Sequence, residues 1–164
     1  LGRSRGLGDV YKRQVIARLM KTAGFWNMAR LAGLKLGKPL NVSSLGNGYS
    51  LTVPMHRFKG TGAYIVDRKA AQALCEGLLP MWLPYDHALD REWAYNFKVV
   101  SVAPFPISQT EEEFVSAIQG NAQRRLPSAL RWRWTYPYQI QNELTRWIVR
   151  GVSAIGLKWK LPRS

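Results

Sequence analysis

The chain of 164 residues is poor in cysteine, histidine and acidic side chains, and these shortages exclude several classes of protein. A single cysteine, Cys75, excludes a framework of intramolecular disulfides. Two histidines, His56 and His87, stand far apart in sequence, so with one cysteine they exclude a Cys/His zinc site. No uncharged apolar run approaches the roughly 20 residues that span a bilayer. The Walker, GxGxxG, GxSxG and HExxH motifs are also missing.

The shortage of acidic residues leaves 24 Lys and Arg against 10 Asp and Glu, a formal net charge of +14. This charge is concentrated at the two ends. Residues 60–119 hold eight acidic and four basic side chains, whereas each flanking segment holds a single acidic one. A nucleic-acid-binding domain more often carries its positive charge on the folded unit itself. We therefore expect no nucleic acid as partner, and a basic nucleic-acid-binding module remains the weaker alternative.

The first segment, residues 1–14, reads LGRSRGLGDVYKRQ and has no amphipathic period. We interpret it as derived from an adapter rather than as native sequence, which would make the chain an amino-terminally truncated fragment. The alternative is a basic arm that binds an anionic partner. We expect three parts: this segment, a partial enzyme domain over 15–120, and a basic, aromatic tail over 121–164.

The remaining sequence predicts an α/β fold, because strand and helix patterns alternate along it. Gly46-Asn47-Gly48 is a turn signal between two alternating stretches and predicts a β-hairpin. Asp67 is the expected N-cap of a helix whose apolar stripe includes Cys75. Expected helices cover 15–23, the residues after Asp67, 86–94 and 111–119, and expected strands cover 40–45, 49–53, 61–66 and 97–102; 25–36 is ambiguous between strand and loop.

Two stretches are candidates for chemistry. Asp86 opens a predicted helix after a proline-containing loop, with His87 beside it and Asp90 four residues on. A carboxylate there could act as a general base on a hydroxyl nucleophile, or it could simply cap the helix. In the second stretch, the small residues around Gly62 would let a sugar or phosphate approach the backbone; tight packing at a strand entry is the alternative.

The segment from Phe58 to Gln109 resembles glycosyltransferase family 25, the bacterial lipopolysaccharide and lipooligosaccharide transferases. The matching pieces, in the order in which the family has them, are GTGAYIV at 60–66, RKAA at 68–71, LPYD at 83–86 and VSVAPFPISQ at 100–109. Each piece alone is weak evidence. Their ordered combination over about 50 residues is fairly specific to the family.

The resemblance implies the carboxyl-terminal portion of a GT-A-like nucleotide-diphospho-sugar transferase fold. It implies inverting transfer of a hexose, often galactose, from a UDP-sugar to a lipopolysaccharide-type saccharide or glycolipid acceptor, at the cytoplasmic face of the bacterial inner membrane. Asp86 would be the catalytic base, and Thr61, Gly62, Tyr64 and His87 would bind substrate. The family also implies a divalent metal, Mn²⁺ or Mg²⁺, whose acidic ligands this chain does not contain.

The tail interleaves tryptophan with basic residues, a composition that suits an anionic membrane surface. An amphipathic helix is expected over about 138–158, with Ile140, Leu144, Trp147, Ile148, Val152 and Ile155 on one face. The predicted membrane-surface residues are Arg131, Trp132, Arg133, Trp134, Trp147 and Arg150. The alternative is a terminal helix that packs Trp147 and Ile148 onto the domain. Because the metal motif is missing, a non-catalytic membrane-surface adaptor also remains possible.

Overall fold

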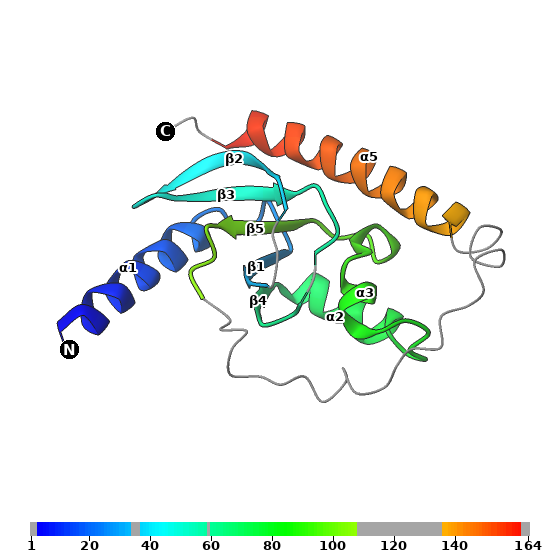
Figure 1. Cartoon of the computed structure of the whole chain (residues 1–164), viewed down its shortest axis with the longest axis horizontal. Coiled ribbons are helices and arrows are strands. Elements are labelled where there is room, and N and C mark those ends of the chain that lie inside the picture. The colour runs from blue at the N-terminus through cyan, green and yellow to red at the C-terminus, as the bar shows by residue number, and fades with distance from the viewer. Residues whose placement is uncertain (1–2, 34–36, 59, 108–135, 162–164) are drawn as a thin grey trace.

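The structure, a computed structural model, describes residues 3–33, 37–58, 60–107 and 136–161, and of residues 3–9 it describes the backbone only. One five-stranded sheet forms the centre, with helices packed around it (Figure 1). The elements are α1 (Arg3–Met20), β1 (Met28–Ala32), β2 (Pro39–Gly46), β3 (Tyr49–Pro54), β4 (Ala63–Val66), α2 (Arg68–Gly77), α3 (Tyr85–Leu89), the 3-10 helix η1 (Glu92–Ala94), β5 (Val99–Ala103) and α5 (Tyr136–Lys160). The α/β class is confirmed. The predicted helix over 111–119 lies outside the described residues.

The sheet is mixed, with strand order β2-β3-β5-β1-β4. β1 and β5 run parallel at its centre, and the other pairs are antiparallel. Arg30 on β1 is paired with Tyr64 on β4 and with Ser101 on β5. Paired residues project to the same face of a sheet. Arg30 and Tyr64 therefore share one face, which is the face on which the candidate site lies.

The predicted hairpin is confirmed as β2 and β3. Asn47 and Gly48 form its turn with φ of 54° and 78°. Two central residues with positive φ match the right-handed twist of the strands, and Asn-Gly is the preferred pair for them. Gly46, also at positive φ, lies against the guanidinium of Arg18 on α1, which donates to the Leu45 carbonyl at 2.7 Å. The turn thus helps to fix α1 on the sheet.

Helix α1 begins earlier than the sequence predicts. It runs without a break from Arg3 past residue 14, so part of the segment excluded from the fold is helical. Only the later turns pack: Val15 and Leu19 are fully buried, whereas Val10 and Tyr11 are about half exposed. Tertiary burial of a short apolar stripe outweighs the weak local pattern here. Whether residues 1–14 are native sequence stays a prediction.

The predicted N-cap of α2 is confirmed. The Asp67 carboxylate accepts a hydrogen bond from the Ala70 backbone N–H at 2.7 Å. Ala70 and Leu74 pack on Met28 and Val99 of the sheet. Cys75, expected on the packed stripe, is instead exposed. It lies one residue beyond Leu74, which is enough to rotate it out of the narrow buried face of a ten-residue helix.

The helix expected over 86–94 is two short elements. α3 begins at Tyr85 with Pro84 at its N-cap position, so Asp86 lies in the first turn and is not the cap. The chain then leaves the helix at Asp90 and re-forms a single 3-10 turn, η1. Because this break redirects the chain, Asp90 and Glu92 point into the protein and are almost fully buried.

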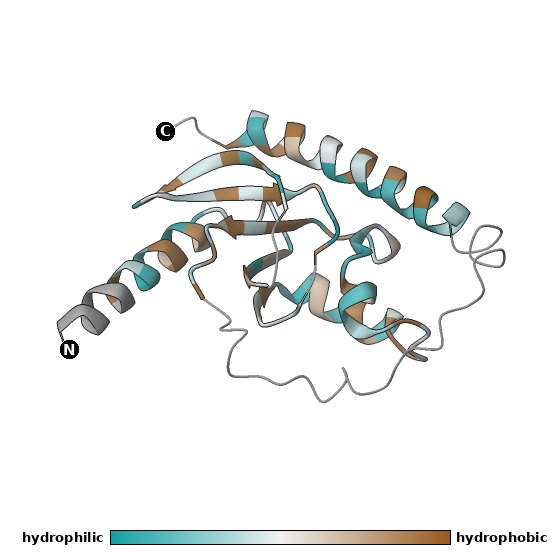
Figure 2. Ribbon diagram, viewed as in Figure 1, coloured by the Kyte–Doolittle hydropathy of each residue, from teal (hydrophilic) through white to brown (hydrophobic). Residues whose placement is uncertain are grey.

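Helix α5 confirms the helix expected over 138–158. The alternative, in which Trp147 and Ile148 pack onto the domain, predicts that the apolar face is buried, whereas in the structure the opposite face is buried. The buried side chains are Arg146, Arg150, Ala154 and Leu157. The predicted apolar face points outward, with Ile140, Leu144, Trp147, Ile148, Val152 and Ile155 each at least half exposed. Figure 2 shows apolar and polar residues alternating along this helix. α5 therefore turns its charged arginines inward and its apolar stripe to the outside.

Candidate functional site

The two motifs that carry the family resemblance meet in space. Tyr64 on β4 and Tyr85, the first residue of α3, form a hydrogen bond between their hydroxyl groups at 2.8 Å. Thr61 and Gly62 lie in the segment just before β4, and Asp86 follows Tyr85 directly. The fold thus brings the predicted substrate-binding residue Tyr64 into contact with Tyr85, the residue that precedes the predicted base Asp86.

Asp86 is half buried and only partly engaged. One carboxylate oxygen, Oδ1, accepts from the backbone N–H of His87 at 2.9 Å. Among the described residues, Oδ2 has no hydrogen-bond partner. The charge of Asp86 also acts on the buried Arg30, whose pKa it raises slightly against larger opposing effects. A carboxylate with one oxygen held and the other open can accept a hydrogen bond from a ligand hydroxyl.

Tyr85 belongs to the same site, although the sequence did not single it out. Burial and the hydrogen bond from Tyr64 raise the pKa of Tyr85 to about 12. The Tyr85 hydroxyl therefore stays protonated at neutral pH and can donate or accept. The signal was present in the sequence, because Tyr85 is part of the LPYD motif, but only the acidic residue of that motif had an evident chemical role.

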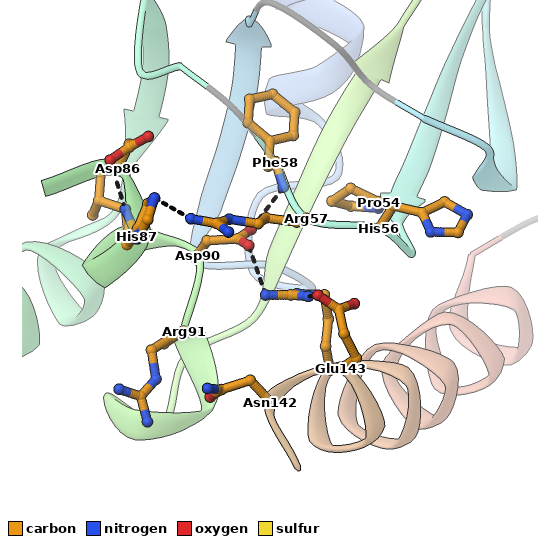
Figure 3. Close-up of polar contacts among 12 residues, drawn as sticks. Pro54, His56, Arg57, Phe58, Asp86, His87, Asp90, Arg91, Asn142 and Glu143 are labelled. Carbon is orange, nitrogen blue, oxygen red and sulfur yellow. Dashed lines mark hydrogen bonds and ion pairs between the residues drawn. The ribbon is translucent and has the colours of Figure 1, made fainter. Parts of the chain in front are cut away.

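His87 contacts Arg57, a residue from the segment after β3 that the sequence analysis missed. The Arg57 guanidinium forms a short hydrogen bond with the His87 ring nitrogen Nε2. Figure 3 shows Arg57 directed toward His87, with Asp86 on the far side of His87 and Asp90 close by. The predicted substrate-binding residue His87 thus lies one residue from Asp86 and forms one side of a basic cluster.

Beneath this surface lies a buried network of charges. Arg150 on α5 uses all its donors: Nε and Nη2 bond the two Glu92 oxygens at 2.5 and 2.8 Å, Nη2 also bonds Asp90 Oδ1 at 2.8 Å, and Nη1 bonds the carbonyls of Pro54 and His56. Burial alone would lower the pKa of Arg150, but Glu92 and Asp90 reverse the shift and raise it. Arg150 therefore stays charged and links α5 to β3 and η1.

Asp90 is shared among three arginines. Besides Arg150, it pairs with Arg146 at 2.9 Å and lies 4.0 Å from Arg30. Arg30 stacks on the Phe58 ring at 4.2 Å and donates to the Leu89 carbonyl at 2.9 Å. Burial is the largest influence on Arg30 and lowers its pKa to about 10, with Asp90 only partly compensating. Arg30 is thus held in a buried position where its acid neighbours only partly offset the effect of desolvation.

The prediction that Arg150 contacts a membrane surface is wrong. Its side chain is 2% exposed and fully bonded inside the protein. In the sequence, Arg150 follows Arg146 by four residues, so both were expected on one face of the helix. This spacing did not indicate whether that face would contact solvent or buried acids. Trp147 is on the exposed side, half accessible, with its ring edge-on to His56 at 5.6 Å. Arg131, Trp132, Arg133 and Trp134 lie outside the described residues.

The described residues do not form a site for the divalent metal that the family implies. No group of three or more His, Cys, Asp or Glu side chains among them could hold a metal ion. The nearest pair of acids, Asp90 and Glu92, is already bonded to Arg150. Two carboxylates committed to a guanidinium do not offer the open oxygen ligands that Mg²⁺ or Mn²⁺ requires.

In comparisons with known proteins, no protein-family profile, no curated protein and no solved structure matches this chain. Within the described part of the chain, no helix is long and apolar enough to cross a membrane.

Proposed function

We propose that the chain forms the acceptor-binding part of an inverting glycosyltransferase of the family 25 type, with a GT-A-like fold. The reaction would move a hexose, with galactose the best candidate, from a UDP-sugar to a lipopolysaccharide-type saccharide or glycolipid. The single observation that supports this is the 2.8 Å contact between Tyr64 and Tyr85. It joins two motifs of the resemblance, GTGAYIV and LPYD, and the half-exposed carboxylate Asp86 directly follows Tyr85 in the second of them.

In this proposal Asp86 is the general base. The open Asp86 oxygen, Oδ2, takes the proton of the acceptor hydroxyl. At the same time the acceptor oxygen attacks the anomeric carbon of the donor sugar, and the bond from this carbon to the UDP oxygen breaks. A base of this kind must lie within hydrogen-bond reach of the proton it removes. The Tyr64 and Tyr85 hydroxyls hydrogen-bond and orient the acceptor ring, and Thr61, Gly62 and His87 line the approach to it.

The donor side is proposed to lie elsewhere. Since the described acids do not suit a divalent metal, we assign no step to a metal held by these residues. The UDP-sugar and any metal that accompanies its diphosphate would be bound by residues outside the described part of this chain. The present residues would contribute the acceptor, its orientation and the base.

The exposed apolar side of α5 favours a second function, binding to the surface of an anionic membrane. Trp147 is 50% and Trp159 86% exposed, and indole rings prefer the headgroup layer. Lys158 and Lys160 lie in the last turn, whereas the only acidic residue of α5, Glu143, is ion-paired with Arg146. Charge and apolar surface therefore both suit anionic lipid. Such binding would place the protein at the cytoplasmic face of the inner membrane, either as the transferase or as a non-catalytic adaptor.

Saccharide binding by the chain itself tests the first proposal. In saturation-transfer NMR, a deacylated lipooligosaccharide core and lactose serve as acceptor probes, and UDP-galactose serves as the donor probe. We expect the protein to transfer magnetic saturation to the two acceptor probes, which shows binding, and not to UDP-galactose. Asp86→Asn should weaken acceptor binding by about 10-fold or more, the value of a hydrogen bond to a charged group. Glu76→Gln, the same change at an exposed acid of α2, is the control and should have no effect. Absence of binding to both acceptor probes would overturn the proposal.

A further inference from the structure

A cavity of about 160 Å³ lies between the end of α3 and the first turns of α5. Three arginines line it, Arg57, Arg91 and Arg146, together with His87. In Figure 3 the Arg57–His87 pair lies on one side of Asp90, and Arg91 and Asn142 lie on the other, near the start of α5. Two carboxylates, Asp90 and Glu143, line it as well, so the basic side chains of the lining outnumber the acidic ones. The cavity lies beside His87, the residue that follows Asp86.

The acids around the cavity do not balance its arginines. Asp90 is already shared by Arg146 and Arg150, and Glu92 is bonded to Arg150. In the whole cluster five guanidinium groups face four carboxylates; the former belong to Arg30, Arg57, Arg91, Arg146 and Arg150, and the latter to Asp86, Asp90, Glu92 and Glu143.

The arginines also keep unused donors. Arg91 Nε and Arg146 Nε are buried and have no hydrogen-bond partner among the residues that the structure describes, and the Arg146 side chain is 5% exposed. Arg91 donates from Nη1 to the Tyr138 hydroxyl, and the described bond of Arg57 is the one with His87. A buried donor without a partner costs about 1–3 kcal/mol. An acceptor-rich ligand in this cavity would recover that cost.

We propose that this cavity binds a phosphate group on the acceptor saccharide. Guanidinium groups recognise phosphate through paired hydrogen bonds, and three of them around one small space suit a doubly charged group. The cavity has several times the roughly 10–15 Å³ that a single water molecule requires, which leaves room for a phosphate group. The inference rests on the proposed function, since it assigns the position of a charged substituent relative to the Asp86 base.

A phosphate group in this cavity could belong to the saccharide acceptor or to the nucleotide donor. The choice of probes distinguishes these two sources. Isothermal titration calorimetry at one salt concentration would compare glucose, glucose 6-phosphate, inorganic phosphate and UDP. We expect glucose 6-phosphate to bind about 10- to 100-fold more tightly than glucose, the range for one strong charged hydrogen-bond pair. Inorganic phosphate should bind weakly and compete with glucose 6-phosphate. Tighter binding of UDP than of glucose 6-phosphate would assign the cavity to the donor and overturn the proposal.

Variants at the cavity complete the test. Arg57→Met with Arg91→Met should reduce the preference for glucose 6-phosphate over glucose to less than about 3-fold, because both lost groups are phosphate ligands. Arg13→Met, on the exposed side of α1, is the matched control and should leave the preference unchanged. As a readout that does not depend on variants, the Nε–H signals of Arg91 and Arg146 should shift on addition of glucose 6-phosphate. Unshifted signals, or a preference that survives in the double variant, would overturn the proposal.

This test separates the phosphate site from the proposed function. Equal binding of glucose and glucose 6-phosphate would leave the acceptor proposal in place and remove the phosphate site. Binding of inorganic phosphate at the cavity without binding of any saccharide would retain an anion site and remove the acceptor proposal.

Discussion

Arg150 and Glu92 form a two-pronged ion pair inside the protein, with guanidinium-to-carboxylate distances of 2.5 and 2.8 Å. Both side chains are 2% exposed. Because this pair needs Arg150 to face the sheet, it fixes the rotation of α5 and leaves the apolar stripe of the helix on the outside. One buried contact therefore helps to determine which face of α5 forms the proposed membrane surface.

Loss of this pair should be costly. Arg150→Met leaves Glu92 buried without its arginine and leaves Asp90 with Arg146 as its close partner. We expect it to lower the free energy of unfolding by about 3–5 kcal/mol, as broken buried pairs do. Urea denaturation followed by circular dichroism would measure the change. Arg13→Met removes an exposed arginine and should change the free energy by less than about 0.5 kcal/mol. An equally small effect of Arg150→Met would show that the pair does not hold α5 in place.

The hydrogen-bonded hydroxyls of Tyr64 and Tyr85 predict that Tyr85 ionises at a higher pH than a free tyrosine. The pKa of Tyr85 is raised to about 12, first by burial and then by the hydrogen bond with Tyr64. In the unfolded chain a tyrosine ionises near pH 10. Between about pH 10 and 12 the folded protein retains a proton that the unfolded chain releases, so this contribution to stability is complete below pH 10 and is lost as the pH rises through that window.

Absorbance at about 295 nm, where ionised tyrosine absorbs, would follow this ionisation. The difference between wild type and Tyr85→Phe should have its midpoint near pH 12. Tyr64→Phe should move the midpoint down, because the bond that favours the neutral phenol is lost. A wild-type midpoint close to pH 10 would show that Tyr64 and Tyr85 do not interact as described.

The outward face of α5 predicts membrane binding that depends on its apolar side chains. Leu144→Asp with Ile155→Asp places two carboxylates on that face and should reduce co-sedimentation with vesicles of phosphatidylglycerol and phosphatidylethanolamine by at least about 10-fold, from lost apolar contact and added repulsion. Gln139→Asp adds a carboxylate to an exposed position on the opposite side of the helix from the stripe and serves as the control. If wild type and the double variant sediment equally, α5 does not contact lipid. A concentration-dependent dimer that the double variant abolishes would instead identify a second copy as the occupant.

The hairpin turn predicts a difference between two glycines with the same backbone conformation. Gly46 and Gly48 both have positive φ, so alanine is strained at each. At Gly46 the added methyl would also collide with the Arg18 guanidinium and displace it from the Leu45 carbonyl, whereas at Gly48 it meets nothing within 4 Å. We expect Gly46→Ala to destabilise the protein by about 1 kcal/mol more than Gly48→Ala, measured by urea denaturation. Equal losses would mean that Arg18 does not help to dock α1.

Local signals in the sequence predicted the local structure well. The Asn47-Gly48 turn and the Asp67 cap were predictable because each depends on a few neighbouring residues with a specific geometric preference. Helix boundaries were predicted less well. α3 begins at Tyr85 behind Pro84, since proline suits the start of a helix, and this placed Asp86 inside the first turn rather than at the cap.

Only the tertiary structure decided which charged residues meet. The spacing of Arg146 and Arg150 was visible in the sequence, but their acids, Asp90 and Glu92, lie more than 50 residues earlier in the chain. A pattern of apolar residues normally indicates the buried face of a helix, because burial of apolar area is the usual driving force. In α5 a network of buried ion pairs and hydrogen bonds fixes the opposite rotation, a choice that depends on side chains from β3, η1 and α5 together. The sequence by itself therefore determined the α/β class, the hairpin and the Asp67 cap, whereas the fold decided that Tyr64 meets Tyr85, next to Asp86 in the chain, and that the apolar stripe of α5 faces outward.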